Sequence, residues 1–176
     1  MMAYIDKNTE ASSANFIAFK NGIYNVSTDQ LEEFSKDRIM TNKINWNYKP
    51  DAYCKLTDDV LNRLACQDRQ VRLLLEELIG YCFYRRNELR KAFMLKGKRH
   101  NGKSTFLDML GYLLGSDNVS ALDLGDLSHE YKASGLFGKL ANLGDDIEDE
   151  FMEYQKAFMR VVSKIRSENM MTFPVL

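Results

Sequence analysis

The chain has 176 residues, of which 45% are hydrophobic and 28% are charged, and its formal net charge is −1. This length and apolar content predict a single domain with a buried core, with room for a small appendage. A net charge near zero provides no overall field that attracts nucleic acid, so any such contact must come from local basic patches.

Membrane proteins and zinc proteins are not expected from this sequence. No apolar run reaches the roughly 18 residues of a membrane-spanning helix and no signal peptide is evident, so we expect a cytoplasmic protein that does not bind membranes. Cys54, Cys66 and Cys82 lack the paired spacing of zinc ligands. We expect all three to be small buried residues in a reducing compartment.

The first part of the chain predicts a β-hairpin and a further short strand. Asn21-Gly22 is a strong turn signal between apolar runs at 16–19 and 23–26. The further strand is indicated by the alternation of Ile44, Trp46 and Tyr48.

Two helices are predicted next. Thr57 is a candidate N-cap for the first of them. The second is longer, and its apolar stripe, which we expect to pack into the core, consists of Val71, Leu74, Leu75, Leu78, Ile79 and Cys82. A basic connector at 84–90 then leads into the second half of the chain.

Residues 97–105 read Gly-Lys-Arg-His-Asn-Gly-Lys-Ser-Thr, which matches the phosphate-loop pattern G-x-x-x-x-G-K-[ST]. The apolar stretch before it predicts a strand at 92–96, and apolar residues at helical spacing after it predict a helix that ends at Gly115. In this setting backbone N–H groups and the helix N-terminus face phosphate oxygens. Lys103 would reach the β- and γ-phosphates and Ser104 would bind Mg²⁺, so ATP with Mg²⁺ is the predicted ligand.

The tip of this loop is basic, with Lys98, Arg99 and His100 at positions that often hold small residues. Two interpretations stay open: a solvated loop tip, or a contact to a neighbouring subunit or to nucleic acid. Further along, a second strand is predicted at 118–124 and a short helix within 126–138.

An acid pair completes the predicted site. Residues 139–146 read as a buried strand that delivers Asp145 and Asp146 at its carboxyl end. Mg²⁺ takes oxygen ligands and retains waters, so Asp145 can hold the metal through its water while Asp146 orients or deprotonates the attacking water. Because acidic residues follow at 148–150, a polar turn is the alternative.

Several of these strings together resemble a known family. They are residues 97–105, 113–115 and 137–147 and, upstream, residues 19–24, 41–42 and 78–82. The resemblance is to the phage and plasmid primase–helicases, superfamily three helicases of the AAA+ class. The upstream strings are similar to the domain that precedes the helicase core in poxvirus-type members.

The resemblance implies an α/β fold, with a P-loop AAA+-type ATPase core at 91–176 after a hairpin and helical region at 1–90. It implies an ATP-driven 3′–5′ DNA translocase that acts in phage or mobile-element replication within a bacterial host, as a hexamer when complete. Phosphate binding falls to Gly97, Asn101, Gly102, Lys103, Ser104 and Thr105, and metal and water handling to Asp145 and Asp146.

Family members also continue with a polar sensor, a DNA-contacting hairpin and an arginine that completes the neighbour's site. Only three parallel strands are predicted here, so we expect an incomplete sheet. The chain is accordingly expected to be a fragment, a truncated product or one that self-associates, with weak or absent DNA unwinding on its own.

Three functions are weighed on this basis. The leading one is the ATPase module of a primase–helicase, and the alternative is a non-catalytic helicase relic that serves as an interaction or regulatory protein. A kinase with the same loop is disfavoured by the short spacing from loop to acids. DNA-stimulated hydrolysis, binding without turnover, and phosphate transfer to a small acceptor would distinguish the three.

Overall fold

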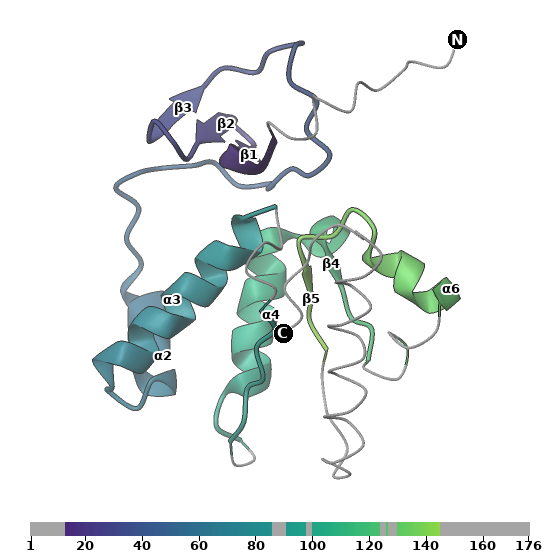
Figure 1. Ribbon diagram of the computed structural model, residues 1–176. Helices are drawn as coiled ribbons and strands as arrows, with labels where there is room; N and C mark the ends of the chain where they lie inside the picture. The colour runs from purple at the N-terminus through teal and green to yellow at the C-terminus, as the bar shows by residue number, and fades with distance from the viewer. Residues whose placement is uncertain (1–12, 86–90, 98–99, 124–125, 127–129, 145–176) are drawn as a thin grey trace.

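The computed structural model describes residues 13–85, 91–97, 100–123, 126 and 130–144 (Figure 1). A short 3₁₀ helix at Ser13–Asn15 leads into a three-stranded antiparallel sheet in the order β1-β2-β3. Its strands are β1 (Phe16–Phe19), β2 (Gly22–Asn25) and β3 (Gln30–Glu32). The predicted hairpin is therefore confirmed.

The hairpin turn lies one residue earlier than the Asn-Gly pattern indicates. Phe19 pairs with Gly22, which leaves Lys20 and Asn21 at the tip. The Asn21 side chain is used elsewhere: its Nδ2 donates to Tyr48 O at 3.0 Å and its Oδ1 accepts from Tyr48 N at 2.8 Å. This paired contact fastens the hairpin tip to the segment that follows the sheet.

The strand expected around Ile44, Trp46 and Tyr48 is reduced to one β-bridge. Ile44 bridges Phe19 in parallel. Hydrogen bonds from Ile44 N to Ala18 O (2.8 Å) and from Lys20 N to Trp46 O (2.9 Å) hold this segment beside β1. The contact is too short to form a regular ladder.

Both helices predicted before residues 97–105 are present, and the first starts earlier than expected. α2 spans Lys55–Leu64 and follows an extended Cys54, so Thr57 lies in the first turn and the predicted N-cap is wrong. α3 spans Arg69–Phe83 and is capped by Asp68, whose Oδ1 accepts from Gln70 N at 2.7 Å and Val71 N at 3.2 Å.

The second half of the described chain is built around α4 (Lys103–Leu114), as the apolar spacing predicts. A 3₁₀ helix (Ser116–Asn118) leads to β4 (Val119–Ser120). The short helix α6 (Glu130–Ala133) and a 3₁₀ turn (Ser134–Leu136) then precede β5 (Ala141–Asn142). β4 and β5 pair in parallel and run opposite to α4, so their carboxyl ends point toward the end of α4 that carries the loop (Figure 1).

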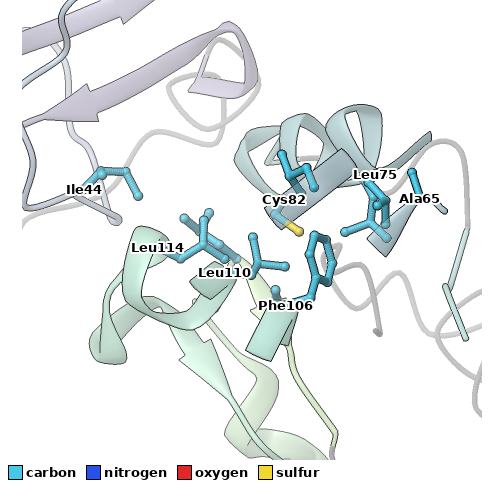
Figure 2. Packing of buried hydrophobic residues seen from close by; sticks show 11 residues of the cluster. Ile44, Ala65, Leu75, Cys82, Phe106, Leu110 and Leu114 are labelled. Atoms are coloured by element: carbon cyan, nitrogen blue, oxygen red, sulfur yellow. The ribbon is translucent and has the colours of Figure 1, made fainter. Parts of the chain in front are cut away.

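One hydrophobic cluster joins both halves of the chain (Figure 2). Phe106, Leu110 and Leu114, at helical spacing on α4, are 0–1% exposed. Leu75, Leu78 and Cys82 pack against them from α3. The cluster thus contains residues from both sides of the domain boundary that the sequence predicts at residue 90. The boundary stays a prediction.

Part of the expected apolar stripe of α3 is not buried, because Val71 and Leu74 are 41% and 50% exposed. The expectation for the cysteines is likewise wrong for two of the three, since Cys54 and Cys66 are exposed. Cys82 is buried, and burial raises the pKa of its thiol to about 12. A hydrogen bond with Thr57 lowers the pKa of Cys54.

The strand expected at 92–96 is represented by a single bridge at Ala92 among the described residues. None of the helices in the described part of the chain combines the length and apolar character needed to cross a bilayer.

Candidate functional site

The loop before α4 turns sharply at two positions. Gly102 has φ 88° and is the N-cap of α4, and His100 has φ 60°. Both lie in the left-handed region, which glycine enters without the steric cost that a Cβ brings. The backbone at Gly102 therefore favours glycine.

The first turn of α4 offers donors to the loop. The first intrahelical bond joins Phe106 N to Gly102 O at 3.0 Å. The N–H groups of Ser104 and Thr105 precede it, at the helix end where donors lack an intrahelical acceptor, and no side chain caps this end. Both residues are exposed, whereas Phe106 anchors the turn in the core. This is the arrangement in which a helix N-terminus binds phosphate.

Lys103 crosses the loop. Its Nζ donates to Gly97 O at 3.2 Å and to Asn101 Oδ1 at 3.0 Å. The ammonium group, the first and last glycines of the pattern, and Asn101 therefore lie together at one end of α4. Lys98 and Arg99, the basic residues predicted at the tip of this loop, lie outside the described residues.

The helical region upstream contacts the loop directly. A Cβ built on Gly102 would lie 2.7 Å from Cδ2 of Leu64, the last residue of α2. A side chain at position 102 would require Leu64 to move. The close approach of α2 thus adds a packing reason for glycine at this position.

A groove of about 700 Å³ runs beside α4. Ser104 and Asp108 line it from the helix, and Leu143 lines it from the segment just after β5. A Cβ on Gly111 would lie 3.4 Å from Cδ1 of Leu143, so α4 and this segment are in contact. The predicted Mg²⁺ ligand Ser104 thus shares a groove with the carboxyl end of β5.

Asp145 and Asp146 follow Gly144 in the chain and lie outside the described residues. Within those residues, no group of three or more His, Cys, Asp or Glu side chains could hold a metal ion. The residues that can be tested fit a nucleotide with Mg²⁺: a glycine turn, a helix N-terminus, an ammonium group and the Ser104 hydroxyl at a groove. The acid half of the site stays a prediction.

At the opposite end of α4, buried asparagines join the two halves of the chain. Asn42 Nδ2 donates to Asn118 Oδ1 at 3.0 Å and to Gly138 O at 2.7 Å. Asn118 Nδ2 donates to Lys43 O and Leu114 O, both at 2.8 Å. We call Asn42 and Asn118, with these backbone partners, the asparagine joint.

Sequence reasoning did not identify the asparagine joint or Asn142, which is 1% exposed and bonds to Ser120 Oγ, Leu122 N and Leu122 O at 2.8 Å. Asn118 stands at the start of the strand predicted at 118–124, and Asn42 and Asn142 lie within strings that carry the family resemblance, but neither signal indicated their hydrogen-bond partners. Apart from Leu114, the partners of these asparagines lie on segments 20 to 96 residues away in the chain.

Comparison with known sequences divides the chain into two parts. Residues 5–66 match the family described as D5 N terminal like. This region is found in phage and plasmid primase–helicases, so the match supports a relation to those proteins. It contains the sheet β1-β2-β3 and α2.

Residues 95–174, which include the phosphate-loop pattern, match a family of unknown function, DUF5906. A search of the curated proteins found no match. The D5 N terminal like region is thus the part that relates the chain to primase–helicases and DNA replication, while the chemistry of the loop rests on its own residues.

Proposed function

We propose that the chain is the ATP-binding and ATP-hydrolysing module of a phage or mobile-element primase–helicase, of the superfamily three and AAA+ type, acting in the cytoplasm of a bacterial host. The observation that carries this proposal is the loop itself. Gly102 turns in the left-handed region at the start of α4, and Lys103 spans the loop from Gly97 to Asn101. These features suit a polyphosphate at the helix N-terminus.

Each residue has a role in this proposal. The N–H groups of the first turn of α4 and the ammonium of Lys103 bind the phosphates, and the Ser104 hydroxyl holds Mg²⁺. Asp145 shares the metal and Asp146 orients the attacking water. Bound Mg²⁺ would supply the positive charge that stabilises the leaving phosphate. The groove shared by Ser104 and Leu143 supports pairing the loop with the carboxyl end of β5.

The partners in this proposal are DNA and further copies of the chain. The D5 N terminal like match supports a role in replication. DNA would be single-stranded or forked, and the ATPase is expected to work as a hexamer in its complete form.

Nucleotide binding and hydrolysis, each measured with and without DNA, test the proposal. Lys103→Ala should abolish ATP binding because it removes the ammonium that faces the phosphates. Asp146→Asn should spare binding and reduce hydrolysis, because a neutral amide cannot take a proton from water. Unchanged ATP binding by Lys103→Ala would rule out the phosphate-loop role. Binding without turnover in the native chain would favour a non-catalytic interaction protein.

A further inference from the structure

One contact in the loop is not demanded by the phosphate-loop pattern, which leaves position 101 unspecified. The Asn101 side chain lies against Gly97, and its oxygen accepts a hydrogen bond from Lys103 Nζ at 3.0 Å. The same ammonium group donates to Gly97 O at 3.2 Å. Three positions of the loop therefore form one connected unit.

The side chain of Asn101 occupies the space where a side chain at position 97 would lie. A Cβ built on Gly97 would lie 1.9 Å from Asn101 Nδ2 and 3.1 Å from its Cγ, far closer than non-bonded atoms approach. Gly97 itself is not among the residues with positive φ, so its backbone does not require glycine. An alanine at 97 would fit the backbone and displace the carboxamide of Asn101.

The orientation of this carboxamide follows from the chemistry of Lys103. An ammonium group has donors only, so the amide oxygen faces Lys103 and the amide nitrogen faces Gly97. A lysine side chain has many rotamers, and fixing it costs about 1.5–2 kcal/mol of conformational entropy. The oxygens of Gly97 and Asn101 already hold the Lys103 ammonium group before a ligand binds. Less of the entropy cost is therefore left to be met by the binding free energy.

We propose that Asn101 is the positioning residue of Lys103: its carboxamide, seated in the space that glycine leaves at 97, holds the ammonium group across the loop ready for a polyphosphate. This inference rests on the proposed function, because it concerns the same site. It also gives Gly97 a role of its own, which is to leave space for Asn101. Gly102, in contrast, is explained by its backbone conformation.

Calorimetric titration with ATP and Mg²⁺ of the native chain, Gly97→Ala, Asn101→Ala and the double variant tests the proposal. Each single change removes the same charged hydrogen bond, so each should weaken affinity about tenfold. Since the two changes act through one contact, the double variant should bind about as well as either single variant. Asn47→Ala, at an exposed asparagine outside the loop, is the matched control and should leave affinity unchanged.

A second readout needs no nucleotide. Acetylation of Lys103, followed by mass spectrometry, should be faster in Asn101→Ala and in Gly97→Ala than in the native chain, with circular dichroism verifying that each variant folds. Additive losses of affinity, about a hundredfold in the double variant, would overturn the positioning role, as would native rates of acetylation. If the native chain binds no ATP, the proposed function fails as well; additive variants of a chain that binds ATP overturn only the role of Asn101.

Discussion

The two glycine positions of the phosphate-loop pattern disfavour a side chain for different reasons. At Gly102 a side chain is excluded twice, by φ 88° and by Leu64 Cδ2 at 2.7 Å from a built Cβ. At Gly97 the obstacle is the flexible end of Asn101. Substitutions at the two positions should therefore affect different properties of the protein.

Gly102→Ala should destabilise the fold by about 1–2 kcal/mol, because an L-residue at positive φ is strained and Leu64 must move. Urea unfolding followed by circular dichroism measures this change. Gly80→Ala is the matched control: Gly80 lies within α3 and a Cβ there meets no atom within 4 Å. It should stabilise the fold by about 0.5–1 kcal/mol. Equal effects of the two substitutions would contradict this account of Gly102.

At the scale of elements, the helix starts show how local signals compete. Thr57 has the right residue type for an N-cap, yet α2 begins at Lys55 and Thr57 interacts with the Cys54 thiol instead. Asp68, which the sequence analysis did not single out, caps α3. Capping depends on an extended residue at the boundary, and the residue type alone does not fix where that boundary falls.

Asp68→Ala should cost about 1 kcal/mol of stability, since the N–H groups of Gln70 and Val71 lose their acceptor. Thermal and urea unfolding measure the loss. Asp68→Asn keeps a side-chain oxygen at the same place and should stay close to the native stability. A loss of equal size in both variants would mean that the charge of Asp68, and not its hydrogen bonds, stabilises α3.

At the scale of the whole molecule, α4 connects two distant features. The loop at 97–102 precedes its first turn, and its last turn bonds to the asparagine joint through Leu114 O, at the end of α4 that faces the sheet β1-β2-β3 (Figure 1). Trp46 also lies at that end, where its Nε1 donates to Tyr112 O at 3.2 Å and its ring lies 5.1 Å from that of Tyr112. The region that matches the D5 N terminal like family thus contacts α4 at both ends, through Asn42 and Trp46 at the last turn and through Leu64 at Gly102.

Asn118→Ala should destabilise the protein by about 2–3 kcal/mol, because Asn118 is 4% exposed and three of its hydrogen bonds are lost. Trp46 is the only tryptophan of the chain, so its fluorescence reports on this end of α4 during urea unfolding. Asn47→Ala changes an exposed asparagine and should have little effect. A small loss for Asn118→Ala would show that packing alone holds the two halves together.

Local signals were enough for the elements with strong periodicity or strict turn chemistry. The hairpin was predicted from the Asn21-Gly22 turn signal between two apolar runs. The helices α3 and α4 were predicted from apolar residues at helical spacing, with Gly102 and Gly115 at the ends of α4. β3 was missed because Gln30, Leu31 and Glu32 form an edge strand with one apolar residue, itself 39% exposed. The lengths of β4 and β5 are set by their pairing with each other, and no periodicity in the sequence predicts how many residues pair.

The sequence by itself determined that a glycine turn precedes α4 and that Lys103 and Ser104 begin this helix, because the pattern at 97–105 is local and its turn and helix start lie within nine residues. Only the tertiary structure decided that Leu64 closes on Gly102, that Asn101 fills the space at Gly97, and that Asn42 meets Asn118. These contacts depend on how rigid elements pack, and packing is set by the shapes of surfaces that come together only when the chain has folded.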